Sequence, residues 1–161
     1  MNFGIEEMIS VLAMISSGLL LVFVVDWRYF QDWIVVFLFK GLLDLMLGSP
    51  IVTLHLLEYP IRLFPDYYQT SILFELWVLP ILCILYNQIT RERGVQSIIS
   101  YALLFSAVIT AIEYFLEIYT KLIKYMQWSW LASFCTLAIT FLISRSFIAF
   151  YRWGCDYFNH K

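Results

Sequence analysis

Apolar residues run along this chain in five long stretches, which are separated by short polar or aromatic segments. A helix needs about 20 mostly apolar residues to cross a hydrocarbon core of about 30 Å. The pattern therefore predicts an all-α polytopic transmembrane helix bundle of about five spans. We expect the spans at residues 8–25, 33–57, 71–90, 97–119 and 128–150. Because only short loops remain between them, residues 1–161 are predicted to form a single membrane-embedded domain.

The second predicted span contains the sequence Gly48-Ser49-Pro50 near its end. A proline removes a backbone donor and disfavours a straight helix, so we expect the helix to be broken there. The segment that follows, which also contains Pro60 and Pro65, continues as a kinked helix or lies as a short helix at the interface. A four-span arrangement, in which the chain around residues 48–50 enters the bilayer and returns, is the main alternative.

Composition agrees with a membrane location and excludes a basic nucleic-acid-binding protein. Hydrophobic residues make up 62% of the 161 residues and charged residues 14%, whereas an ordinary soluble domain has about 45–50% and about 25%. A chain of this size cannot bury so much apolar surface, so lipid must cover much of it. With 10 Lys and Arg against 12 Asp and Glu, the chain is not a basic nucleic-acid binder. The expected partner is the lipid bilayer.

Basic residues in the short loops predict the orientation, because Lys and Arg are enriched on the cytoplasmic side of membrane proteins. With five spans, one side holds Arg28, Arg91, Arg93, Arg152 and Lys161, with Arg145 close by, and the other holds Arg62, Lys121 and Lys124. We therefore expect a multi-pass protein of the cytoplasmic (inner) cell membrane. Its N-terminus is expected outside and its C-terminus in the cytoplasm.

Several ionisable residues fall within or next to the apolar stretches and share the outer half of the predicted bilayer. Such residues cost about 2.5–3.5 kcal/mol each to insert, so they usually face the bundle interior. The candidate pocket residues are His55, Glu58, Arg62, Glu75, Glu113 and Glu117. The first three share one face if the chain stays helical across Pro60. The group predicts either a structural cluster that fixes helix register or an acidic pocket that binds a cation or relays protons.

Lys40 and Asp44 lie four residues apart within the second span and are a candidate intramembrane ion pair. A broken helix beside such a pair is one way in which transporters build a substrate site. The pair also neutralises itself, which favours a structural role.

No sequence motif indicates catalysis. The three cysteines, Cys83, Cys135 and Cys155, are widely separated, and no nucleotide-binding, hydrolase or metal-ligand spacing occurs. We therefore predict no catalytic residues, no metal and no cofactor.

A set of short strings occurs in a fixed order along the chain: Asp26-Trp27-Arg28 with Trp33, Leu57-Glu58-Tyr59-Pro60 with Pro65, Leu79-Pro80, Leu85-Tyr86, Ile112-Glu113-Tyr114, and Tyr125 followed by Trp128. With Asp44 in the second span, this arrangement resembles an uncharacterised family of small multi-spanning integral membrane proteins from spore-forming Gram-positive bacteria. The resemblance runs from about Asp26 to Trp130. It implies an inner-membrane protein with no established activity and suggests Asp44, Glu58, Pro60 and Glu113 as the first positions to test.

Two main functional hypotheses follow from these observations. The first is a non-enzymatic accessory or interaction protein in which the ionisable groups fix helix packing. The second is a small channel or transporter for a cation, a proton or a small solute that uses the outer acidic cluster. Five short helices hardly enclose a transport path, so the second hypothesis implies a homo-oligomer or a membrane partner protein. An intramembrane metalloenzyme is a third and weaker hypothesis.

Overall fold

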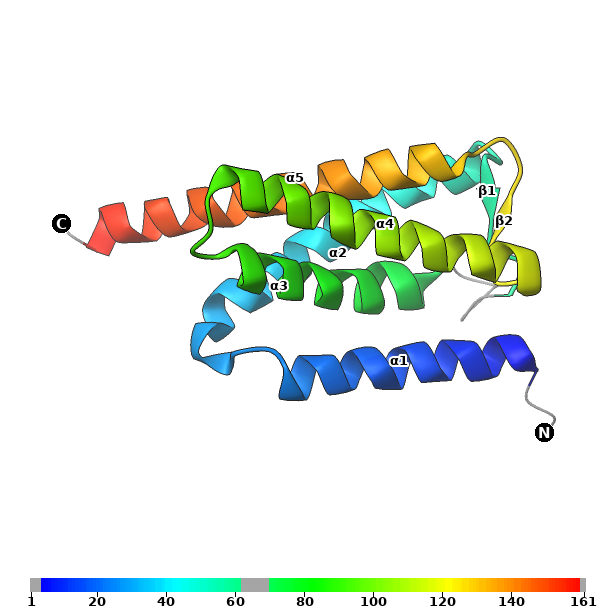
Figure 1. Ribbon diagram of the computed structural model, residues 1–161, viewed down its shortest axis with the longest axis horizontal. Helices are drawn as coiled ribbons and strands as arrows, with labels where there is room; N and C mark the ends of the chain where they lie inside the picture. The colour runs from blue at the N-terminus through cyan, green and yellow to red at the C-terminus, as the bar shows by residue number, and fades with distance from the viewer. Residues whose placement is uncertain (1–3, 62–69, 160–161) are drawn as a thin grey trace.

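The computed structural model describes residues 4–61 and 70–159, and these residues form five α-helices that run along one axis (Figure 1). The helices are α1 (Ile5–Phe23), α2 (Phe30–Thr53), α3 (Leu79–Thr90), α4 (Val95–Tyr119) and α5 (Trp130–Asn159). A 3-10 turn, η1 (Trp27–Tyr29), precedes α2, and a π-helical turn, η2 (Phe74–Val78), precedes α3. Strands β1 (Leu57–Glu58) and β2 (Lys124–Tyr125) pair antiparallel. The predicted all-α bundle is confirmed.

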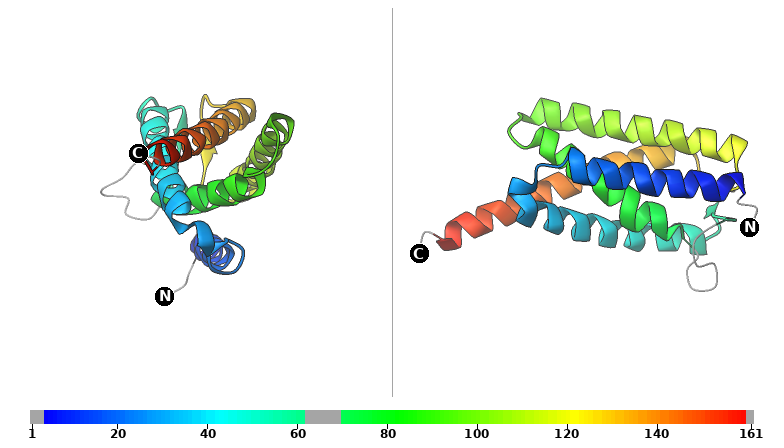
Figure 2. Two further views of the ribbon diagram at one scale, coloured as in Figure 1. Left: turned by 90° about the vertical axis from the view of Figure 1, so that its left-hand side faces the viewer. Right: turned by 90° about the horizontal axis from the view of Figure 1, so that it is seen from below.

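Four helical segments of the described chain are long and apolar enough to cross a membrane. They are Ile5–Phe23, Trp27–Thr53, Val95–Tyr119 and Trp130–Tyr157. The first of them, α1, lies at the edge of the bundle (Figure 2), and Ser17 is its one buried residue among those described. Apolar side chains on so exposed a helix need lipid around them. The chain is a multi-pass membrane protein.

The remaining helical segment, residues 72–90, is shorter but lies at the centre of the bundle. It contains η2 and α3, and α3 contacts α1, α2, α4 and α5. At ~1.5 Å per residue it is about 28 Å long, close to the thickness of a hydrocarbon core. The first and last described residues lie at opposite ends of the bundle (Figure 1), which is the arrangement expected of five passes.

The break that the sequence predicts at Gly48-Ser49-Pro50 is not present. Helix α2 continues through Pro50 to Thr53. Because Pro50 lies in the last turn, its missing N–H removes a single hydrogen bond close to where the helix ends. His55 then takes the left-handed conformation, with φ 53°, which is uncommon outside glycine and directs the chain into β1.

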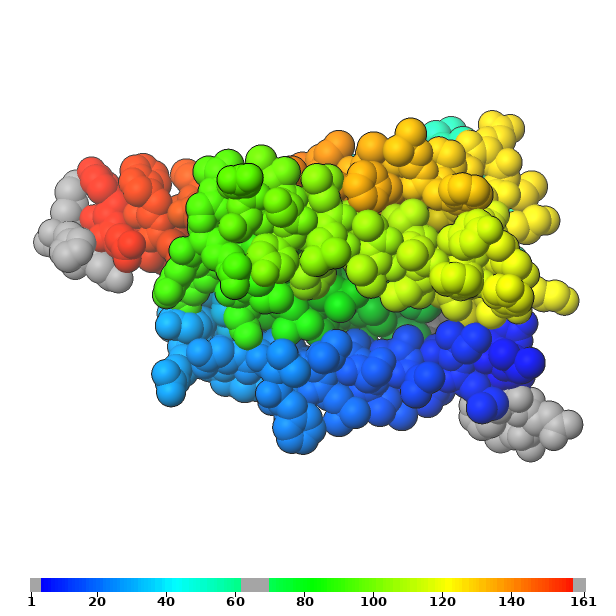
Figure 3. All heavy atoms as spheres, viewed as in Figure 1, coloured from blue at the N-terminus to red at the C-terminus, as the bar shows by residue number. Residues whose placement is uncertain are grey.

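The two halves of the bundle differ in packing. The half next to the α3–α4 loop, here called the loop half, is filled by the rings of Tyr86, Phe105 and Phe141, whose centroids lie 5.2–6.0 Å apart. Both Tyr86 and Phe141 are fully buried. The half next to β1 and β2, here called the hairpin half, contains a pocket. The C-terminal part of α5 extends beyond the loop half (Figure 3).

Candidate functional site

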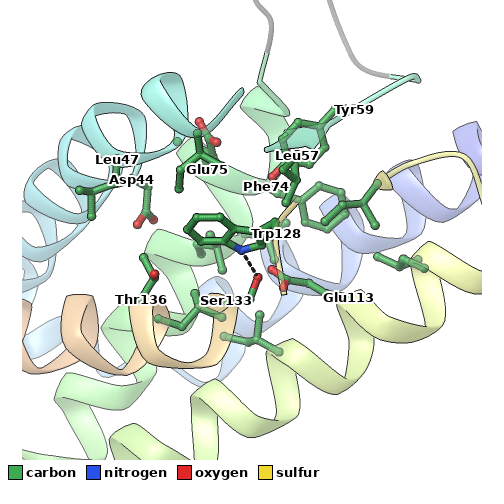
Figure 4. Close-up of a pocket in the computed structure, with 18 of the residues that line it drawn as sticks. Asp44, Leu47, Leu57, Tyr59, Phe74, Glu75, Glu113, Trp128, Ser133 and Thr136 are labelled. Atoms are coloured by element: carbon green, nitrogen blue, oxygen red, sulfur yellow. Dashed lines mark hydrogen bonds between the residues drawn. The ribbon is translucent and has the colours of Figure 1, made fainter. Parts of the chain in front are cut away.

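The hairpin half encloses a pocket of about 170 Å³ (Figure 4). Its walls come from α2, the η2–α3 segment, α4 and α5, and residues of the β1 and β2 region close one end. Most of the lining is aliphatic or aromatic. The lining residues with polar side-chain atoms are Asp44, Tyr59, Glu75, Glu113, Trp128, Ser133, Thr136 and Thr140.

Glu75 lies on η2, at a point where the backbone of the central helix departs from α-helical hydrogen bonding. The N–H of Leu79 donates to the carbonyl of Phe74, and Pro80, the next residue, has no N–H to donate. The regular α-helical ladder is therefore interrupted in the turn that contains Glu75. Turns of this π-helical kind are rare and occur frequently at functional sites.

The carboxyl group of Glu75 lies directly against the backbone of α2 at Gly48. A Cβ atom at residue 48 would overlap the Glu75 Oε1 atom. A side chain at residue 48 would therefore force the Glu75 carboxyl group to move, and this close approach, not a break in the helix, is what the glycine accommodates. Glu75 is 5% exposed, it accepts a hydrogen bond from the side chain of Thr70, and its Oε2 atom has no partner among the described residues.

The structure contains the ion pair expected between Lys40 and Asp44. Lys40 is fully buried, and its Nζ atom lies 5.5 Å from the centroid of the Phe141 ring. Asp44 is 8% exposed and also lines the pocket. Lys40 contacts Oδ1, while Oδ2 of Asp44 has no hydrogen-bond partner in the described part of the chain. The pair therefore leaves one buried carboxylate oxygen unused.

Glu113 is held on another wall of the pocket by a short network of hydrogen bonds. The Tyr125 hydroxyl donates to Glu113 Oε2 at 2.9 Å and lies 3.1 Å from Ser133 Oγ, and Trp128 Nε1 donates to the same Oγ at 2.9 Å (Figure 4). Burial raises the pKa of Tyr125 above its ordinary value, so its hydroxyl stays protonated and able to donate. The network ties the β2 region to α4 and α5.

The charges around the pocket do not balance. Three carboxyl groups line it, from Asp44, Glu75 and Glu113. Among the described residues, Lys40 is the one basic side chain within ion-pair distance of any of them. A buried carboxylate without a partner is costly in an apolar setting. The remaining acids must therefore carry protons or be neutralised by a cation that enters the pocket.

Two of the six predicted pocket residues, Glu75 and Glu113, line the pocket. Glu117 is half-buried on α4 and does not line it. His55 and Glu58 also lie outside the lining; their Nδ1 and Oε1 atoms are 3.8 Å apart, and their side chains are 81% and 40% exposed. The expected shared helical face is not formed, because α2 ends before His55 and Glu58 belongs to a strand. Arg62 lies outside the described residues.

Sequence reasoning missed several members of the site. Asp44 was predicted as a member of an ion pair and was not among the candidate pocket residues, yet it lines the pocket. Ser133, Thr136 and Thr140 recur at spacings of three and four on α5, a pattern typical of helix contact surfaces in lipid. That spacing was the one signal pointing to their face. Trp128 resembles an ordinary interfacial anchor in the sequence, and only the fold places it on the pocket.

The described residues contain no group of three or more His, Cys, Asp or Glu side chains that could hold a metal ion. Comparison with protein-family models, with curated proteins and with solved structures gives no match. The resemblance to small membrane proteins of spore-forming bacteria stays a prediction.

Proposed function

We propose that this chain is a non-enzymatic membrane protein whose pocket binds a small organic cation with an apolar body. The observation that carries the proposal is a pair of buried carboxylate oxygens, Asp44 Oδ2 and Glu75 Oε2, which have no partners among the described residues and belong to two residues that line one pocket. An unpartnered buried acceptor is expensive to maintain. An ammonium group would supply both the missing charge and the missing N–H donors.

The remainder of the lining supports an organic ligand. A hard metal ion takes about six oxygen ligands around one point, whereas no three His, Cys, Asp or Glu side chains of the described residues lie close enough together to hold a metal ion. Tyr59, Phe74 and Trp128 instead present aromatic rings, and the other walls are largely Leu, Ile and Val. Rings of this kind pack against an apolar body and attract a nearby cation through their faces. The volume of about 170 Å³ limits the ligand to a small molecule.

Transport of the same cation is the second candidate function. The interrupted backbone at Glu75 and Pro80 favours it, because transporters use irregular helices to form substrate sites within the membrane. Against it, the loop half is filled by Tyr86, Phe105 and Phe141. Transport therefore requires a second conformation, and with so few helices it implies a homo-oligomer or a membrane partner protein.

The proposed location is the cytoplasmic membrane with the N-terminus outside. Arg91 and Arg152, which lie in the loop half, support this orientation under the positive-inside rule. In that orientation the pocket lies in the outer half of the membrane. An accessory or interaction role, the first hypothesis from the sequence, is the outcome if the pocket takes no ligand.

The test is binding of phenethylammonium to the full-length protein in lipid nanodiscs, measured by isothermal titration calorimetry. We expect saturable binding, and we expect Glu75→Gln to weaken it by about tenfold, equal to about 1.4 kcal/mol, because one attracting charge is lost. The neutral 2-phenylethanol has a similar apolar body and should bind at least about tenfold more weakly.

The matched control is Glu117→Gln, which removes the same charge from α4 at a residue outside the lining. It should leave the affinity within about twofold, which is about 0.4 kcal/mol. Equal binding of the charged and neutral probes, or equal loss in the two variants, would overturn the proposal. Uptake of the amine into proteoliposomes, lost in the Glu75→Gln variant, would favour transport over binding alone.

A further inference from the structure

A second cluster of charged side chains lies in the loop half, at the opposite end of the bundle from the β-strands. Asp32, in the first turn of α2, accepts a hydrogen bond from Arg152 Nε of α5 at 2.9 Å, and its Oδ2 also lies within ion-pair distance of Nη2, at 2.8 Å. Nη2 of Arg91, just after α3, lies 4.0 Å from the same oxygen. Two guanidinium groups from different elements thus converge on one carboxylate oxygen.

Arg145 of α5 adds a third guanidinium group to this cluster. Its Nη2 atom donates to the carbonyl oxygens of Thr90 at 3.3 Å and Arg91 at 3.1 Å, at the C-terminus of α3, where a cation is favoured. The Cζ atom of Arg91 lies 3.2 Å from the centroid of the Tyr29 ring. The three arginine side chains are therefore held in place by residues from separate parts of the chain.

The cluster carries more positive than negative charge. Among the described residues, Asp32 is the one carboxylate within ion-pair distance of Arg91, Arg145 or Arg152. Arginine does not lose its proton in proteins, so the cluster contains three positive charges, of which two lie within ion-pair distance of its one carboxylate. Nη1 of Arg91 and Nε of Arg145 are buried and have no acceptor in the described part of the chain. The contact between Asp32 and Arg152 is enough to hold α2 against α5. The positive charges of Arg91 and Arg145 are not needed for that contact.

Exposed tryptophans next to the cluster indicate that it lies near the headgroup level of a membrane, where phosphate groups are present. Trp27 and Trp153, on the neighbouring parts of the chain, are 48% and 63% exposed, and exposed tryptophans mark the headgroup level of a bilayer. The side chains of Arg91 and Arg152 are 25% and 23% exposed, so a group at that level reaches them. Guanidinium groups match phosphate oxygens in charge and geometry.

We propose that Arg91, Arg145 and Arg152 form a binding site for a phosphate group at this end of the bundle. An anionic phospholipid headgroup and a soluble phosphate share the chemistry that the site recognises. Asp32 competes with the phosphate for Arg152. The site is separate from the pocket and does not rest on the proposed cation binding.

The test is native mass spectrometry of the detergent-solubilised full chain with equal amounts of phosphatidylglycerol and phosphatidylcholine. We expect about fivefold preferential retention of phosphatidylglycerol, and we expect Arg91→Gln to reduce that preference about threefold. The matched control is Arg28→Gln at the same end, because Arg28 is 87% exposed and lies 4.0 Å from Asp26. That control should retain the preference, as should Glu75→Gln in the pocket.

The Asp32→Asn variant distinguishes a phosphate-binding site from a group of arginines that only holds the helices together. If Asp32 competes with phosphate, this variant should increase phosphatidylglycerol retention by about twofold or more. If the arginines only hold the helices together, the variant should not increase the retention of phosphatidylglycerol. Equal retention of the two lipids by the unmodified protein, or an unchanged preference in Arg91→Gln, would overturn the proposal whatever Asp32→Asn does.

Sodium phosphate at millimolar concentration, compared with sodium chloride at equal ionic strength, distinguishes the two sources of the phosphate. Specific displacement of phosphatidylglycerol by phosphate supports a site that also accepts soluble phosphate. Retention that is the same in both salts supports the lipid headgroup as the occupant.

Discussion

The loop half and the hairpin half of this bundle bury polar side chains in different ways. In the loop half, Asn87 Nδ2 donates to the Cys83 carbonyl at 2.9 Å, and Thr90 Oγ1 donates to the Tyr86 carbonyl at 2.7 Å. Asn87 Oδ1, Arg91 Nη1 and Arg145 Nε in the same half have no partner among the described residues, but aromatic rings fill the space between the helices there. In the hairpin half, carboxyl groups surround a pocket, and Asp44 and Glu75 each keep an oxygen without a partner among the described residues.

This difference separates polar groups packed among other side chains from polar groups beside a space that a ligand can enter. A polar side chain with partners inside a close-packed core fixes the arrangement of the helices. A buried charged group beside empty volume destabilises the core unless something else neutralises it. In the hairpin half, a ligand that enters the pocket and neutralises a buried charge would therefore add to stability.

The largest expected difference between the halves is in packing energy. Phe141→Ala removes a fully buried ring and should lower the free energy of unfolding by about 3–5 kcal/mol. Phe74→Ala removes a ring from the wall of an existing pocket and should cost less than about half of that. Denaturation in mixed micelles, followed by circular dichroism, measures both, and equal losses would contradict the distinction.

A smaller effect is expected from adding one methyl group next to Glu75. In Gly48→Ala the new Cβ overlaps the Glu75 carboxyl group, which must move, and affinity for phenethylammonium should fall by about tenfold or more. The control is Gly18→Ala in α1, where the nearest side-chain atom belongs to Trp77 at 3.9 Å. Calorimetry should show that the Gly18→Ala variant binds phenethylammonium with unchanged affinity. Unchanged affinity in the Gly48→Ala variant would show that Glu75 does not contribute to the binding site.

The affinity of the pocket for a cation should depend on pH. A protonated carboxyl group is neutral and no longer attracts an ammonium ion, so affinity should decrease as pH falls, by up to about tenfold per pH unit for each proton displaced. Glu75→Gln should flatten this dependence because its side chain does not titrate. Calorimetric titration with phenethylammonium at several pH values tests whether the affinity decreases as pH falls. Tighter binding at low pH would contradict the prediction.

The smallest effect is expected at the exposed pair next to the pocket. His55 and Glu58 lie on the surface with 3.8 Å between their nearest charged atoms. Exposed pairs contribute about 0.2–1 kcal/mol, so Glu58→Gln should change the free energy of unfolding by less than about 1 kcal/mol and leave cation affinity unchanged. A large loss of binding would show that the pocket extends to the surface at this point.

Local sequence patterns were sufficient for part of this description. The Lys40–Asp44 pair follows from spacing within one helix, and the same rule correctly groups Ser133, Thr136 and Thr140 on one face of α5. Pro50 shows the limit of local rules. A proline breaks a helix interior, but its consequence depends on how much helix follows, and here three residues follow before the end.

The residues that line the pocket could not be predicted from local sequence patterns, because those patterns do not contain the distances between helices. His55, Glu58 and Glu75 share one predicted depth, yet a single left-handed residue at His55 removes the first two from the helix and from the pocket. The contact between Gly48 and Glu75 joins residues 27 positions apart through the packing of two helices. Depth can be estimated from position along a span, but the direction of a side chain depends on the rotation of its helix against its neighbours.

The sequence by itself determined that lipid surrounds this protein, that its elements are helices, and roughly where each one lies. These properties are sums over neighbouring residues, because hydrophobicity and helix length accumulate along the chain. Only the tertiary structure decided that Asp44, Glu75 and Glu113 line one pocket, while at the other end Arg91 and Arg152 meet Asp32 and Arg145 binds the carbonyl oxygens beside them. Those groupings depend on how the helices are rotated and packed, which places together residues that are distant in the chain.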